Sequence, residues 1–142
     1  MKRQDKYPDT DTYHFYNANP HNKFTDDCVI RALSTAMEQS WKDTFNDLCQ
    51  ISLKYGVMPT DTKCFSRYLK QNGWIKQSQP RKRDNTKYTG KEFIKEILYD
   101  NAPYTNIIAK IGGHHIVAII NGKVYDTWDS TEGCIGNYWI QG

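Results

Sequence analysis

Three residues whose side chains can together catalyse acyl transfer stand out in this chain: a cysteine, a histidine and an aspartate. Cys28 follows two aspartates and precedes an apolar helical stripe, so it stands where a helix should begin. The unpaired N–H groups and the dipole of a helix N-terminus favour the thiolate, which is the nucleophilic form of cysteine. The preceding aspartates oppose this effect, because nearby negative charge disfavours a thiolate. Cys28 therefore needs a histidine partner to become a good nucleophile.

A predicted hairpin supplies the histidine and the carboxylate. The Asn121-Gly122 dipeptide favours a type I′ turn, which would pair Ile120 with Lys123. Alternation of side chains along this register places His115 and Asp126 on one face of the hairpin as diagonal neighbours. A carboxylate beside an imidazole fixes its tautomer and stabilises its cationic form. The hairpin thus predicts a histidine–aspartate pair that could serve Cys28.

The same pattern leaves rivals open. His114 lies on the opposite face of the hairpin, where Asp129 would face it if the ladder continued, and a one-residue slip would exchange the two faces. A single cysteine at a helix start is often only a small buried apolar residue. Cys134, in a glycine-flanked loop, is the rival nucleophile.

The remaining cysteines, Cys49 and Cys64, are interpreted as structural. None of the four cysteines forms a C-x-x-C pair, so the sequence indicates no zinc site or redox pair, and we expect no metal and no cofactor.

The elements that must position these residues follow from periodicity and capping. A helix is expected to begin at Cys28, with Asp26 or Asp27 as its N-cap. Further helices are expected over residues 40–56, 61–71 and 89–98, the last with a capping box formed by Thr89 and Glu92. Strands are expected over residues 105–111, 115–120, 123–128 and 138–140.

Helices followed by antiparallel strands predict an α+β fold. Residues 1–25 are polar and are expected to form an irregular N-terminal arm, and residues 26–142 are expected to form a single domain.

Composition limits the partners. A net charge of +3 does not require nucleic acid, and we interpret the basic stretch from Lys76 to Lys91 as a solvated loop rather than a nucleic-acid site. The longest apolar run, 116–120, is far too short to span a bilayer. The charged start of the chain does not resemble a signal peptide, so we expect a cytoplasmic protein with free thiols and no membrane partner. The sequence leaves the oligomeric state open.

Two blocks resemble small papain-like cysteine peptidases of bacteriophages and mobile elements, many of them uncharacterised. The blocks are Asp27-Cys28-Val29-Ile30-Arg31-Ala32-Leu33 and residues 115–129. The resemblance implies a papain-like fold, in which N-terminal helices include a nucleophile helix packed on a small antiparallel sheet. It also implies Cys28 as nucleophile, His115 as general base and acid, and Asp126 as the residue that orients the base. Asn22, six residues before Cys28, would replace the glutamine that many such enzymes use as an oxyanion donor.

Three functions stay open. The first is a cysteine hydrolase that cleaves an amide, peptide or isopeptide bond in a peptide or protein through a thioester. The second is a phage-encoded protein that binds or inhibits a host protein in the host cytosol, with the triad unused. The third is a transglutaminase-like or acyltransferase enzyme that uses the same thioester.

Overall fold

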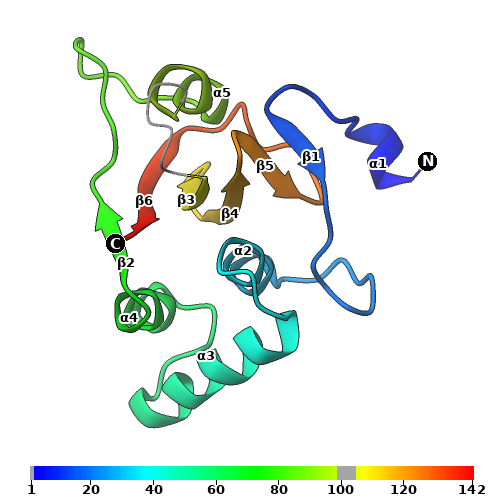
Figure 1. Cartoon of the computed structure of the whole chain (residues 1–142), viewed down its shortest axis with the longest axis vertical. Helices are drawn as coiled ribbons and strands as arrows, with labels where there is room; N and C mark the ends of the chain where they lie inside the picture. The colour runs from blue at the N-terminus through cyan, green and yellow to red at the C-terminus, as the bar shows by residue number, and fades with distance from the viewer. Residues whose placement is uncertain (1, 99–104) are drawn as a thin grey trace.

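The computed structural model of the chain describes residues 2–98 and 105–142 (Figure 1). The described helices are α1 (Arg3–Lys6), α2 (Cys28–Ala36), α3 (Trp41–Tyr55), α4 (Thr62–Gln71), α5 (Gly90–Glu92) and the π-helix η1 (Phe93–Leu98). The described strands are β1 (Tyr13–Phe15), β2 (Trp74–Gln77), β3 (Asn106–Ile111), β4 (His115–Ile120), β5 (Lys123–Asp126) and β6 (Ile135–Gln141). They form an α+β fold, in which the main helices precede most of the sheet.

The six strands form one sheet in the order β1-β5-β4-β3-β6-β2. β1 runs parallel to β5, and the other neighbouring strands in this described sheet are antiparallel. The predicted hairpin register is confirmed, because Ile120 pairs with Lys123 and Ala118 with Tyr125. Asn121 and Gly122 both have positive φ, 48° and 79°, as a type I′ turn requires.

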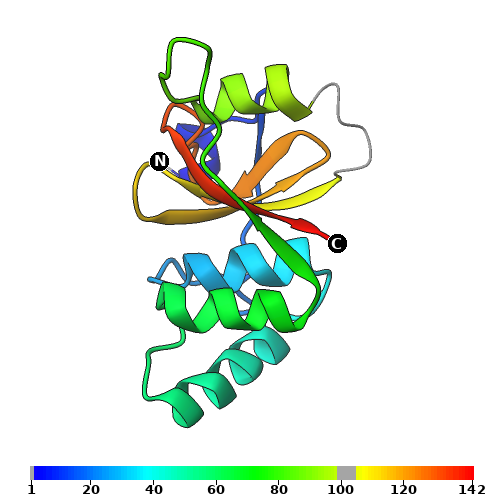
Figure 2. The same ribbon diagram turned by 90° about the vertical axis from the view of Figure 1, so that its left-hand side faces the viewer.

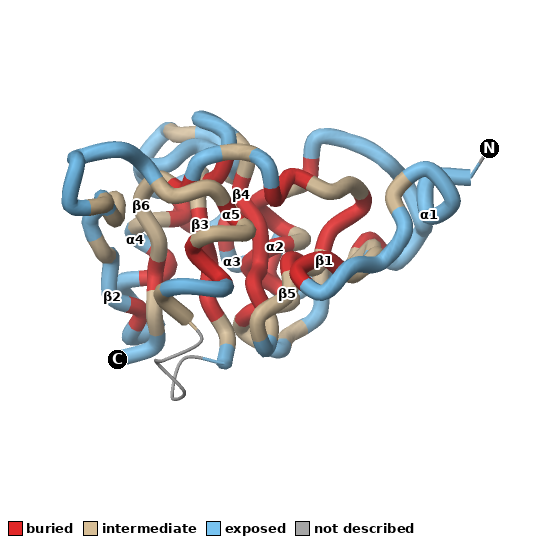
Figure 3. Tube along the Cα trace, turned by 90° about the horizontal axis from the view of Figure 1, so that it is seen from above, coloured by how far each residue is buried: buried red, intermediate tan, exposed pale blue. Residues whose placement is uncertain are grey.

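Helices cover both faces of the sheet (Figure 2). α2 and α4 pack on one face with α3 outside them, and α5 and η1 lie over the other. On β4, Ile116 and Ala118 belong to the core under α2, whereas Val117 and Ile119 belong to the core under η1. Burial is therefore concentrated on the central strands and α2, while α1 is exposed (Figure 3).

Several predicted helix boundaries are confirmed. The hydroxyl of Ser40 accepts a hydrogen bond from the backbone N–H of Asp43 at the start of α3, and Gly56 ends that helix with a φ of 68°. At α5, Thr89 and Glu92 form the expected reciprocal capping box.

The structure differs from the predicted irregular arm over residues 1–25. Tyr13–Phe15 forms the edge strand β1, and the Tyr13 ring is fully buried. Its hydroxyl donates to the backbone carbonyl of Asp126 at 3.1 Å. A three-residue strand has almost no periodicity of its own, and its partner β5 lies more than a hundred residues away, so local patterns could not reveal it.

Three other strand boundaries also differ. β2, which starts before the basic stretch and includes Lys76, was not expected, and β6 begins at Ile135 rather than at residue 138. β5 ends at Asp126 rather than at Trp128, because β4 and β5 separate there. In the part of the chain that the structure describes, no helix has the length and apolar character needed to cross a bilayer.

Candidate active site

Three element ends bring the predicted site residues together. Cys28 is the first residue of α2, His115 the first of β4, and Asp126 the last of β5. The Cys28 thiol and the His115 imidazole line one cleft, and each shifts the pKa of the other. The other side of that ring contacts Asp126, with 2.5 Å between His115 Nε2 and Asp126 Oδ2.

The site occupies the place where β4 and β5 part. Their ladder ends at the pair Ala118–Tyr125, so the next hydrogen-bonded pair, Ile116 with Thr127, does not form. The N–H of Ile116 instead acts on Cys28, whose pKa it helps to lower. The N–H of Thr127 donates to Asp126 Oδ1 at 2.7 Å. The two backbone N–H groups that are left unpaired in the ladder therefore both act on residues of the site.

The separation of the strands also explains how His115 and Cys28 meet although they belong to opposite faces of the sheet. Strict alternation puts His115 on the face of Val117, which packs under η1, whereas α2 packs on the opposite face. His115 can nevertheless reach Cys28, because it lies at the strand end and α2 begins there. Hairpin alternation explains the His115–Asp126 pair, but the contact with Cys28 depends on where α2 begins.

The His115–Asp126 pair is shielded from water. The imidazole side chain is 16% exposed and the carboxylate 3%. An ionised carboxylate only accepts hydrogen bonds, so Nε2 carries the proton and Nδ1 is left for the sulfur. The indole of Trp128 lies against the imidazole, with 4.8 Å between ring centroids. Asp126 therefore fixes the tautomer of His115 while Trp128 limits its motion.

The electrostatics of the pair favour a charged thiolate and a charged imidazolium. Burial of Cys28 opposes ionisation. Hydrogen bonds from His115 and the Ile116 N–H, together with the positive charges of His115 and Arg31, outweigh this effect and lower the pKa of Cys28. Burial likewise disfavours the imidazolium, yet hydrogen bonds and charge from Asp126 and Cys28 raise the pKa of His115 to about 9.

The sequence reasoning missed Arg31. Its Nη1 donates to Asp126 Oδ1 at 2.5 Å, and its Nε donates to Asp27 Oδ1 at 2.8 Å. The spacing could have revealed its pair with Asp27, because Arg31 lies four residues after Asp27 and three after Cys28, on the same helix face.

The prediction that an aspartate side chain caps α2 is wrong for Asp27. Asp27 occupies the N-cap position, but its side chain makes no capping hydrogen bond. Its carboxylate, which is buried, instead accepts from Arg31, Asn19 and Trp41. Arg31 offsets the negative charge that was expected to oppose the Cys28 thiolate. The first-turn N–H groups of α2 are left without a side-chain cap from Asp27.

A cleft of about 490 Å³ gives access to the site, and its lining includes Cys28, His115, Thr60, Phe24 and Trp128. It is large enough for part of a peptide chain.

Asn22, the predicted oxyanion donor, does not line this cleft. It is exposed, and its backbone N–H bonds the carbonyl of Asn19. The role of Asn22 stays a prediction.

The rival residues are arranged differently. His114 is exposed in the turn before β4, and Asp129 accepts from the backbone N–H and hydroxyl of Thr131. Among the described hydrogen bonds and ion pairs, none joins His114 to Asp129.

The other thiols lack an imidazole partner among the described residues. Cys134 is exposed in a small hollow of about 230 Å³ that no histidine lines. Cys64 is buried and donates to the carbonyl of Leu48, and burial raises its pKa. Cys49 lies half-buried on α3, and the structure gives it no histidine contact.

Within residues 2–98 and 105–142, no cluster of three or more histidine, cysteine or acidic side chains is arranged to hold a metal ion. Comparisons with protein-family models, with curated proteins and with solved structures found no match to this chain. Its chemistry must therefore be inferred from the site itself.

Proposed function

We propose that the protein is a papain-like cysteine hydrolase that cleaves an amide, peptide or isopeptide bond. One observation carries the proposal: the contact chain from the Cys28 thiol through His115 to the buried Asp126 carboxylate, at the wall of an open cleft. The order of these residues in the chain and the start of the nucleophile helix at Cys28 agree with a papain-like arrangement. The α+β fold is compatible with it.

The chemistry runs through a thioester. The Cys28 thiolate attacks the carbonyl carbon, and the oxyanion forms near the Cys28 backbone N–H, which has no intrahelical partner at the first position of α2. The carbon–nitrogen bond breaks as His115 protonates the leaving amine. Water then attacks the thioester while His115 takes a proton from it. The carboxylic acid leaves and the Cys28 thiolate is restored.

Acylation of the protein by p-nitrophenyl acetate tests this chemistry without a known substrate. We expect release of nitrophenolate and one acetyl group on Cys28, found by peptide mass spectrometry and removed by hydroxylamine. His115→Ala should suppress the acylation, and Cys134→Ala should leave it unchanged.

Acylation that is spread over several thiols, or that does not depend on His115, would contradict the proposal and favour a binding protein with an unused triad. Transfer of the acetyl group to an added amine in preference to water would favour an acyltransferase.

A further inference from the structure

Arg31 is a charged residue of the site, yet it takes part in no step of the proposed reaction. Its side chain is only 11% exposed, and it lies between two carboxylates, Asp27 and Asp126. Burying three charged groups is unfavourable unless each one is paired and hydrogen-bonded. Arg31 satisfies both carboxylates at once, which suggests a specific task beside the catalytic pair.

The two oxygens of Asp126 have separate partners. Oδ2 faces His115 Nε2, and Oδ1 accepts from Arg31 Nη1 and from the Thr127 N–H. Rotation of the carboxylate would break all three contacts. We propose that Arg31 is a positioning residue, which holds the Asp126 carboxylate toward His115 and places a positive charge beside the Cys28 thiolate. This role rests on the proposed function.

Arg31 is itself held from the other side. Its Nε donates to Asp27 Oδ1, while Asp27 Oδ2 accepts from Asn19 Nδ2 at 3.1 Å and from Trp41 Nε1 at 2.9 Å. Asp27 and Asn19 are both buried. The imidazole is thus connected through Asp126, Arg31 and Asp27 to the start of α3 and to the segment that precedes α2.

The charge of Arg31 acts on the nucleophile as well as on the carboxylate. Burial opposes ionisation of Arg31, but Asp126 and Asp27 raise its pKa, so it stays cationic. Its charge is one of the influences that lower the pKa of Cys28, after the hydrogen bonds from His115 and the Ile116 N–H and the charge of His115. The other charged or titratable groups that line the cleft with Cys28 are Arg3, Asp26, His114 and His115.

Lysine could replace only half of this role. The planar guanidinium directs Nε to Asp27 and Nη1 to Asp126 at the same time, whereas an ammonium group is a compact point charge. Arg31→Lys therefore keeps the charge and loses the geometry, and Arg31→Gln loses both. The two variants separate electrostatic support from positioning.

The test measures the pH dependence of Cys28 alkylation by iodoacetamide, together with turnover of p-nitrophenyl acetate. In Arg31→Gln we expect the midpoint of the alkylation profile to move to higher pH. At pH values below the midpoint, the alkylation rate should fall on the order of tenfold for each pKa unit of this shift. In Arg31→Lys the midpoint should stay near that of the parent while turnover falls. Arg67→Gln is the matched control, since Arg67 lies on α4 over the ring of Tyr55, and it should match the parent in both measurements.

A folding defect must be separated from this effect, because Arg31→Gln leaves two buried carboxylates without a cation. The double variant Asp27→Asn/Arg31→Gln removes one of these charges. In it, the NMR signal of the His115 Nε2–H proton should exchange with water faster than in the parent.

A folded Arg31→Gln protein with the parental alkylation profile, or a folded double variant with the parental imidazole signal, would overturn the positioning role. If His115→Ala itself left Cys28 alkylation unchanged, the proposed function would fail first. If alkylation and turnover fell in His115→Ala but not in the Arg31 variants, this inference would be overturned while the proposed function would stand.

Discussion

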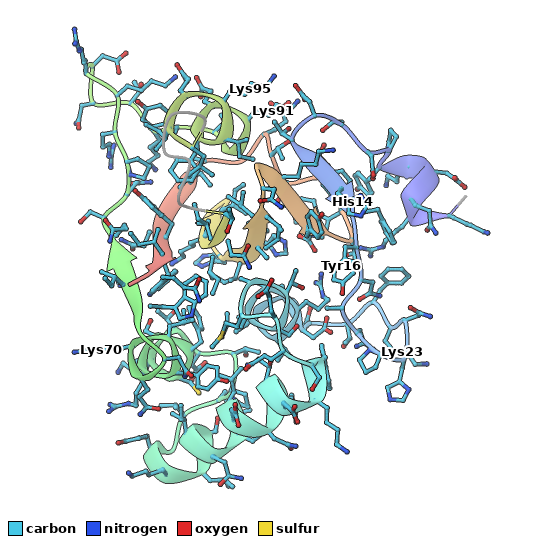
Figure 4. The ribbon with its side chains drawn as sticks, viewed as in Figure 1. His14, Tyr16, Lys23, Lys70, Lys91 and Lys95 are labelled. Atoms are coloured by element: carbon cyan, nitrogen blue, oxygen red, sulfur yellow. The ribbon has the colours of Figure 1, made fainter. Side chains whose placement is uncertain are left out.

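Two histidine–aspartate pairs among the described residues have nearly equal lengths but very different surroundings. His14 Nδ1 lies 2.6 Å from Asp9 Oδ2 at the β1 edge of the sheet (Figure 4), and His115 Nε2 lies 2.5 Å from Asp126 Oδ2. The side chains of the first pair are 41% and 50% exposed, and those of the second 16% and 3%. The distance between imidazole and carboxylate is thus a poor guide to function.

Each imidazole also lies against an aromatic ring, with 4.8 Å between centroids: Tyr125 beside His14, and Trp128 beside His115. What distinguishes the second pair is a thiol on the far side of the ring and a buried cation behind the carboxylate. The described contacts of His14 include neither. Water screens an exposed pair strongly, whereas burial lets a pair polarise its neighbours. The Cys28 thiol and the Arg31 guanidinium, rather than the histidine–aspartate pair itself, therefore distinguish the candidate site.

Removing the two imidazoles should give the largest contrast. His115→Ala should lower the rate of p-nitrophenyl acetate turnover on the order of 10² or more, because it removes the group that activates Cys28 and transfers protons. His14→Ala should leave the rate near that of the parent. Comparable losses in both folded variants would show that the buried pair has no special role.

Removing the two carboxylate charges should give the next contrast. Asp126→Asn leaves Arg31 partly unpaired in a buried site, so the free energy of unfolding should fall by about 3–5 kcal/mol in urea titrations. The pKa of His115, followed by NMR, should fall below its raised value of about 9. Asp9→Asn should change the free energy of unfolding by less than about 1 kcal/mol, because its pair is exposed. A stable Asp126→Asn protein with an unshifted His115 would contradict the proposed coupling.

The pH dependence of the buried pair should have two separate limbs. The lowered pKa of Cys28 means that thiolate forms below the ordinary thiol range, so alkylation should rise with pH and level off as that group ionises. The raised pKa of His115 means that imidazolium persists up to about pH 9. Turnover of an amide substrate, whose leaving amine His115 must protonate, should therefore fall above that pH while alkylation does not. Because Cys28 and His115 interact, the apparent pKa of each limb belongs to the pair rather than to one residue. If both rates rose together through pH 9, Cys28 would not form an ion pair with His115.

The rival residues should show the smallest effects. His114→Ala and Cys134→Ala should each keep turnover within about twofold of the parent, because His114 has no described bond to Asp129 and no histidine lines the hollow at Cys134. A large loss in folded His114→Ala would transfer the base to His114. Faster alkylation of Cys134 than of Cys28 between about pH 6 and 8 would transfer the nucleophile.

Local signals were strong enough to predict the elements that carry the site. The Asn121-Gly122 turn is confirmed with its register, and so is the capping box at Thr89. A helix does begin at Cys28, and the main helices and strands give the predicted α+β class. These features depend on hydrogen bonds and side-chain alternation within a few residues, so the sequence alone determines them.

Tertiary structure decided what surrounds these elements. β1 exists because Tyr13 is buried beside β5, and β4 parts from β5 where α2 begins. Asp27 had the sequence signature of a cap, but it binds Arg31, Asn19 and Trp41 instead. Each of these outcomes depends on groups brought together from distant parts of the chain, where burial decides which partner a polar group takes. Local patterns contain no information about that competition. The spacing of four residues could suggest that Arg31 pairs with Asp27, but only the folded chain could reveal that Arg31 also binds Asp126.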